Sequence, residues 1–120
     1  MQLVSPRPGS LGAASTYLGK AQGFAANVSN DPTHAPLQNL TDGVKFAKLA
    51  AAELFLAEPR SEFQDLVLAR QLVIEGQGLL EQAIKVQTTQ FGSHQPAQVK
   101  QLAHDAFNVF EDVFEIIQND

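Results

Sequence analysis

Apolar residues recur every three or four positions along most of this 120-residue chain, and the clearest run lies near its C-terminal end. From Val99 to Ile117 they fall on one side, which predicts a helix with a broad apolar face over 96–118. We expect Phe107, Phe110 and Phe114 on that face to anchor a core or an interface, because each phenylalanine buries on the order of 150–250 Å².

The same spacing predicts three earlier helices. The first covers 10–28 and is capped by Ser10. The second covers 42–57, with Thr41 as its N-cap, Asp42 in its first turn and Pro59 just beyond its end. The third covers 61–90 and is the longest. It begins at a capping box formed by Ser61 and Gln64.

The third helix carries apolar residues on two sides, so we expect it to be the most buried, with contacts to several neighbours. One stripe is Phe63, Leu66, Val67, Val73, Ile74, Leu80 and Ile84, and the other is Leu68, Leu72, Leu79 and Val86. Gly76-Gln77-Gly78 interrupts its middle, which favours a helix crossing or a local kink. Phe91-Gly92-Ser93 supplies a glycine stop after it.

No stretch alternates in the manner of a strand, and the connections are short except around 29–40. Short connections favour antiparallel neighbours, so we predict an all-α, antiparallel four-helix bundle. It forms a single domain over 10–120, preceded by a flexible N-terminal lead at 1–9. Glycines at 12, 19 and 23 leave open whether the first helix is docked, exchanged between subunits or disordered.

Charge is distributed unevenly around a net value of -5. Residues 61–120 hold three basic residues against nine acidic ones, and no lysine or arginine follows Lys100. Such a half repels phosphate, so we expect neither nucleic-acid binding nor attraction to anionic membranes. There is no long apolar run and no signal-like start, so we expect a cytoplasmic protein without a membrane span. The chain has no cysteine.

We find no pattern typical of a catalytic, cofactor-binding or metal-binding site. His34 and His94 lie in predicted loops, while His104 on the last helix has Asn108, not a metal ligand, four residues on. Gly76-Gln77-Gly78 lacks the lysine and hydroxyl residue of a phosphate loop. We therefore expect no enzyme activity, no cofactor and no metal. The alternative is a ligand- or metal-binding protein or enzyme with a pocket between helices, using His104 with Glu111 or Glu75.

The last helix also offers a candidate interface. Three residues extend its apolar arc beyond the main stripe, and we expect them to be its exposed apolar positions: Leu102, Val109 and Ile116. Acidic residues on the opposite side suit a partner with a basic patch. The candidate interface residues are Leu102, Val109, Phe110, Phe114, Ile116, Glu111, Asp112 and Glu115.

The segment Leu40-Thr41-Asp42-Gly43-Val44-Lys45-Phe46-Ala47-Lys48-Leu49-Ala50-Ala51 resembles a helix of the flagellin-specific export chaperones. Those chaperones are small helical bundles in which an aspartate or asparagine precedes glycine, followed by phenylalanine and alanines. The resemblance covers about a dozen residues with a one-residue gap, and the family's tyrosine-rich last helix has phenylalanines here. It implies a peptide-binding bundle.

The leading hypothesis is a small non-enzymatic helical bundle that acts by binding another protein or a second copy of itself, as in a homodimer. A place in a larger assembly, such as a phage or secretion component, is a further possibility.

Overall fold

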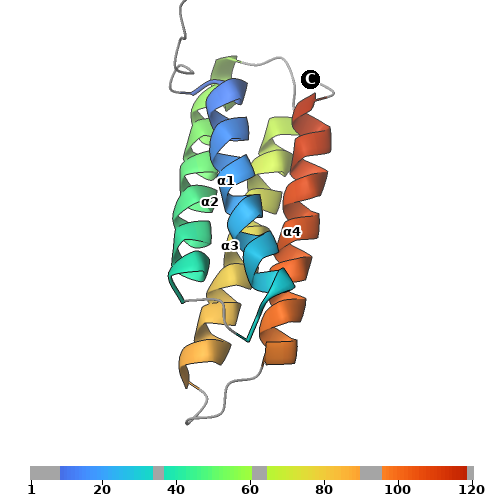
Figure 1. Ribbon diagram of the computed structural model, residues 1–120. Coiled ribbons are helices and arrows are strands. Elements are labelled where there is room, and N and C mark those ends of the chain that lie inside the picture. The colour runs from blue at the N-terminus through green and yellow to red at the C-terminus, as the bar shows by residue number, and fades with distance from the viewer. Residues whose placement is uncertain (1–8, 34–36, 61–64, 90–95, 119–120) are drawn as a thin grey trace, which may run out of the picture.

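A computed structural model describes residues 9–33, 37–60, 65–89 and 96–118. It contains the helices α1 (Leu11–Asn30), α2 (Leu37–Ala57), α3 (Asp65–Thr89) and α4 (Pro96–Gln118), with a short 3₁₀ helix η1 (Glu58–Arg60) after α2. The long helices lie side by side and alternate in direction (Figure 1). The chain is thus an all-α, antiparallel four-helix bundle, as predicted. None of these described helices is long and apolar enough to cross a membrane.

The helices form a ring in the order α1, α2, α3, α4. Each helix packs against its two neighbours in this ring, while the diagonal pairs make few or no contacts. The prediction that the third helix is the most buried is therefore wrong, although it is the longest. Val67, Leu68 and Ile74 of α3 are exposed. Both predicted stripes therefore include exposed residues, and the buried residues of α3 lie toward its neighbours α2 and α4.

Helix α1 is docked on the bundle. The Ser10 hydroxyl accepts a hydrogen bond from the Ala13 N–H at 3.0 Å, which is the predicted N-cap. Leu18 and Val28 are fully buried. The helix extends two residues beyond its predicted end, and the Asp31 N–H then donates to the Asn27 carbonyl at 3.1 Å.

Helix α2 begins earlier than predicted. It starts at Leu37, so Thr41 lies inside the helix and is not its N-cap. The Thr41 hydroxyl donates to the Gln38 carbonyl at 3.0 Å, which is the back-bonding that threonine adopts within helices. Asp42 lies beyond the first turn and accepts a hydrogen bond from Gln38 Nε2 at 2.9 Å. The helix ends at Ala57, just before Pro59, as predicted.

The last two helices follow the predicted pattern closely. Helix α4 covers 96–118 as expected, with Pro96 as its first residue, where proline needs no hydrogen-bond partner. Helix α3 covers Asp65–Thr89 within the predicted range. The proposed capping box of Ser61 and Gln64 and the glycine stop at 91–93 lie outside the described residues.

The core is built mainly from alanine, leucine and valine, and Phe110 is the largest fully buried side chain among the described residues. Its ring lies against Gly76 of α3, where an added Cβ would meet Phe110 Cε1 at 2.4 Å. Helix α3 runs without interruption through this point. Of the two interpretations of the central glycines, the close crossing of two helices is therefore the one observed, and Gly76 is the residue that permits it.

Candidate interaction surfaces

The apolar candidates of α4 face the bundle more than solvent. Phe110 is fully buried, and Phe114 is half-buried against the core. Leu102, Val109 and Ile116 are half-buried as well, so the prediction that they are the exposed apolar positions is wrong. Whether any of these side chains takes part in an interface stays a prediction, but Phe110 is inaccessible in the folded chain.

Helical geometry explains why these three positions are covered. Residues seven apart lie on one flank of a helix, and 102, 109 and 116 form such a row. The opposite flank of α4 carries Phe114, which lies beside Gly19 of α1, so helical geometry places the row on the side toward α3. Helix α3 presents a matching row there, because its second apolar stripe is half-buried against the same core through Leu72, Leu79 and Val86. Helical geometry thus places the row of α4 and the row of α3 on facing sides of the two helices.

The acidic candidates of α4 are all exposed, namely Glu111, Asp112 and Glu115. Glu111 accepts a hydrogen bond from Gln22 Nε2 at 2.8 Å, so its carboxylate is held beside α1. Gln22 also donates to the Phe107 carbonyl at 3.4 Å. This row remains available to a partner along the outer side of α4.

The residues of the alternative ligand site do not converge. His104 and Glu111 lie on the same flank of α4, but seven residues of helix separate them by roughly 10 Å along the axis. Glu75 is exposed on α3. Among the described residues, no group of three or more histidine, aspartate or glutamate side chains is arranged to hold a metal ion. His34 and His94 lie outside the described residues.

Large apolar side chains are instead exposed where α2 meets α3. Phe55, Val67 and Ile74 are 52%, 42% and 46% exposed. Arg70 links them, because its guanidinium lies 5.3 Å from the Phe55 ring centroid and Val67 and Ile74 flank it by about one turn. Arg70 Nε also donates to Glu58 Oε1 at 2.6 Å. We call Phe55, Val67, Arg70 and Ile74 the α2–α3 patch.

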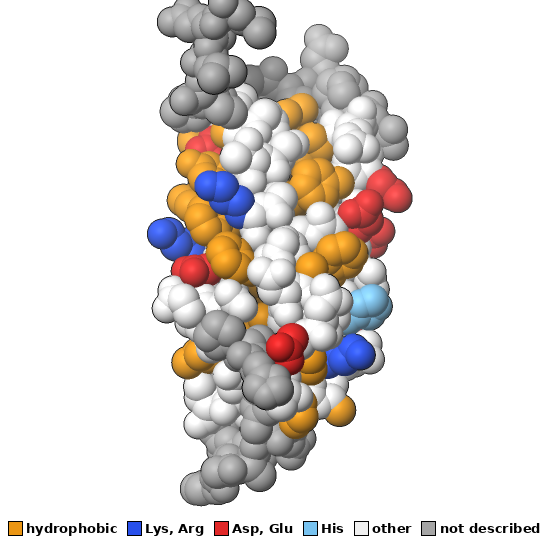
Figure 2. Space-filling model, in the orientation of Figure 1, with side chains coloured by type: hydrophobic (Ala, Val, Ile, Leu, Met, Phe, Trp, Pro, Cys, Tyr) orange, Lys and Arg blue, Asp and Glu red, His pale blue; other side chains and the backbone are white. Residues whose placement is uncertain are grey.

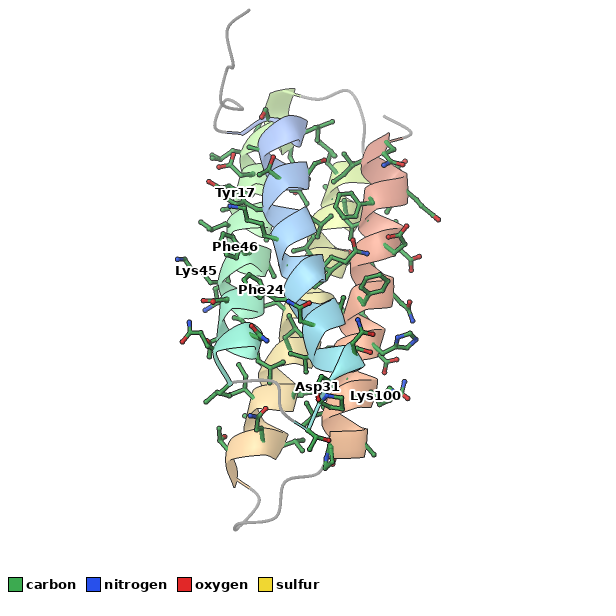
Figure 3. The ribbon with its side chains drawn as sticks, in the orientation of Figure 1. Tyr17, Phe24, Asp31, Lys45, Phe46 and Lys100 are labelled. Carbon is green, nitrogen blue, oxygen red and sulfur yellow. The ribbon has the colours of Figure 1, made fainter. Side chains whose placement is uncertain are left out.

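A second surface lies between α1 and α2. The Phe46 ring stacks between Tyr17 and Phe24, with centroid distances of 6.2 and 5.9 Å (Figure 3). The ammonium groups of Lys20 and Lys45 lie 5.1 and 5.5 Å from its centroid, within cation–π range. An open groove of about 440 Å³ runs along this cluster, lined by Lys20, Gly23, Phe24, Asn27 and Phe46. We call it the aromatic groove.

Sequence reasoning missed both surfaces as candidate sites. Tyr17 and Phe24 were not among its candidate residues. The available signal was their spacing with Lys20, since positions 17, 20 and 24 share one helix face. For the α2–α3 patch the signal was the position of Val67 and Ile74. The prediction assigned them to one stripe with Leu66 and Val73, but each follows one of those residues directly and so lies about 100° around the helix from it.

These features define the structural class of the protein. It is a four-helix bundle with an alanine-rich core, exposed carboxylates on the solvent side of α4 and two partly apolar surfaces on the other helices. No family model, curated protein or solved structure matches the chain. The segment that resembles the export chaperones, residues 40–51, lies within α2.

Proposed function

We propose that this chain acts by binding protein, either a partner or a second copy of itself, through exposed surfaces of its helices. The observation that carries the proposal is the exposure of large apolar side chains in the α2–α3 patch. Exposing a phenylalanine and two β-branched residues together to water does not stabilise a monomer. Grouped exposure of apolar side chains is typical of interaction sites.

The composition of the α2–α3 patch also suits recognition of protein. Interfaces are enriched in aromatic residues and arginine, which combine apolar area with directional hydrogen bonding. Here Phe55 supplies the ring, while Glu58 and the Phe55 ring hold the Arg70 guanidinium from two sides. A side chain held in this way loses less conformational entropy when a partner binds.

The proposal is tested by replacing Phe55 with a photoreactive phenylalanine analogue and irradiating cells that produce the chain. We expect a discrete cross-linked product, either a dimer of the chain or an adduct with one other protein. The matched control places the same analogue at Gln82, which is exposed on α3 away from the patch. Equal labelling from both positions, or none from Phe55, would refute the use of this surface.

A second candidate function is the binding of a small ligand in the aromatic groove. The observation in its favour is the combination of stacked rings with two ammonium groups, which suits an aromatic carboxylate. Thermal-shift measurements against a panel of small aromatic acids test it. We expect a concentration-dependent rise in the unfolding midpoint that is lost in Lys20→Gln. An unchanged midpoint across the panel would exclude this function.

A further inference from the structure

The outward side of α1 lies between two edges of opposite charge. On the α2 side, Lys20 and Lys45 are exposed, and no carboxylate of the described residues lies within ion-pair distance of either ammonium group. On the α4 side, Glu111 and Glu115 are exposed. Figure 2 shows this face of the molecule, with basic side chains and neighbouring carboxylates toward one edge, a row of carboxylates above a histidine and a basic side chain at the other, and a mostly uncharged strip between them.

Both edges lie at the same level along α1. Phe46 stacks between Tyr17 and Phe24, which places it and Lys45 level with Lys20. On the other side, Glu111 is joined to α1 through the hydrogen bond from Gln22. Phe114, between Glu111 and Glu115, lies beside Gly19 of α1, where an added Cβ would sit 3.8 Å from its Cζ.

This arrangement is self-complementary under one symmetry operation. A two-fold axis parallel to the helices exchanges the two edges of the face and keeps every residue at its own level. It brings Lys20 and Lys45 of one copy against Glu111 and Glu115 of the other, and makes the same contact again on the far side. A two-fold axis across the helices would instead set each edge against its like, which repels.

We propose that the α1 face binds a second copy of this chain in a parallel, two-fold symmetric dimer. The α1 face comprises the exposed side of α1, the aromatic groove, Phe107, Phe114 and the two charged edges. The inference rests on the proposed function only in that the chain acts by associating with protein, and it uses a different surface from the α2–α3 patch.

The surface of α1 allows two helices to approach closely. Its exposed residues include Gly12, Thr16, Gly19, Gly23 and Asn27, which follow helical spacing along one side. The chain's own fold does not require the two central glycines. A Cβ at Gly23 would meet nothing within 4 Å, and one at Gly19 would make only ordinary contact. Alanine at either position would stabilise the helix, so the fold of a single chain does not explain the glycines. A second α1 packed closely against these positions would explain them.

Two carboxylates of α2 lie near the basic edge, but neither forms an ion pair with Lys20 or Lys45. Glu53 is eight residues after Lys45, about 12 Å along α2, and accepts a hydrogen bond from the Gly9 N–H. Asp42 lies one turn before Lys45 and accepts a hydrogen bond from Gln38. On the acidic edge, Lys100 lies eleven residues before Glu111, which is about 16 Å along α4. The charge contrast between the edges is therefore concentrated around the levels of Lys20 and Glu111.

Charge reversal in two complementary variants tests the dimer. Lys20→Glu/Lys45→Glu makes both edges acidic, and Glu111→Lys/Glu115→Lys makes both edges basic. For the wild-type chain, light scattering coupled to size-exclusion chromatography should give twice the 13.0 kDa chain mass. Each variant alone should be monomeric, with dissociation constants at least tenfold higher, and mixing them should give a heterodimer by native mass spectrometry.

The matched control is Glu75→Lys/Glu81→Lys. It makes the same change in net charge as Glu111→Lys/Glu115→Lys, on exposed positions of α3, and should leave the dimer intact. A second, independent variant is Gly23→Leu, which adds a bulky side chain at the proposed contact. Because a leucine there favours the helix, we expect a folded monomer with an unfolding midpoint no lower than that of the wild-type monomer.

The inference is overturned if the wild-type chain is monomeric throughout a dilution series, or if the mixed variants fail to associate. It is also overturned if Phe55→Glu abolishes the dimer while the α1 variants retain it, an outcome that would assign the contact to the α2–α3 patch and leave the proposed function standing. If the analogue at Phe55 gives no cross-link while the α1 dimer stays intact, the use of the α2–α3 patch is refuted and the dimer inference stands.

Discussion

The contact between Gly76 and Phe110 offers the sharpest test of the packing, through the single substitution Gly76→Ala. The new methyl group would lie 2.4, 2.8 and 3.0 Å from three atoms of the Phe110 ring. The ring is fully buried, so it has no solvent-filled space into which to move. Overpacking of a core costs about 1–3 kcal/mol, and three simultaneous close contacts favour the upper end.

The intrinsic preference of the helix acts in the opposite direction. Alanine in place of glycine within a helix stabilises by about 1 kcal/mol. Subtracting this gain from a clash of about 3 kcal/mol leaves a net loss of about 2 kcal/mol in the free energy of unfolding. Gly78 is the matched control two residues away, because a Cβ there would meet nothing within 4 Å. Gly78→Ala should therefore raise the free energy of unfolding by up to about 1 kcal/mol.

Urea denaturation followed by circular dichroism measures both effects. The two alanine variants should move the midpoint in opposite directions without changing the slope of the transition. Adding Phe110→Leu to Gly76→Ala should recover part of the loss, because the smaller side chain leaves room for the methyl group, and a double-mutant cycle should report the coupling. The reasoning is refuted if Gly76→Ala is neutral or stabilising, or if the two variants shift the midpoint in the same direction.

Three further predictions follow from the described structure. Ser10→Ala removes the N-cap of α1 and should lower the free energy of unfolding by about 1 kcal/mol in urea titrations, whereas Ser10→Asn should retain most of it. Leu80→Ala opens a cavity at a fully buried site and should cost about 2–5 kcal/mol, and a loss well under this range would mean that the neighbouring helices close the gap. Val109→Glu/Ile116→Glu places charges between α3 and α4 and should abolish cooperative thermal unfolding. If the variant keeps the wild-type unfolding midpoint but its oligomeric mass in solution changes, Val109 and Ile116 belong to an interface.

Helix positions could be predicted well where a boundary signal lies within the helix itself. Pro96 and the regular spacing of α4 identify that helix within its observed bounds. Thr41 misled the prediction for α2, because threonine caps a helix in one context and bonds back to the preceding turn in another. Pro36 was the competing signal, since proline is favoured at the start of a helix and Leu37 follows it directly.

The candidate surfaces were harder to predict, because exposure depends on which helix covers which stripe. The sequence pattern correctly identified Leu102 and Ile116 as lying outside the main stripe of α4, but it could not assign them to α3. The same limit applied to Phe46, whose place between Tyr17 and Phe24 depends on the pairing of α1 with α2. Periodicity reports the face of one helix, whereas a surface is shared by two.

The ring order of the helices also determines how the chain can fold. Three of the four helix–helix interfaces join helices that follow each other in sequence. They form by closing short loops, and such local topologies fold rapidly. The interface between α1 and α4 joins helices far apart in sequence, so it forms only after the other helices have come together. Because α1 and α4 share fewer contacts than α2 and α3 do, amide protons along the α1–α4 interface should exchange with solvent sooner than those between α2 and α3.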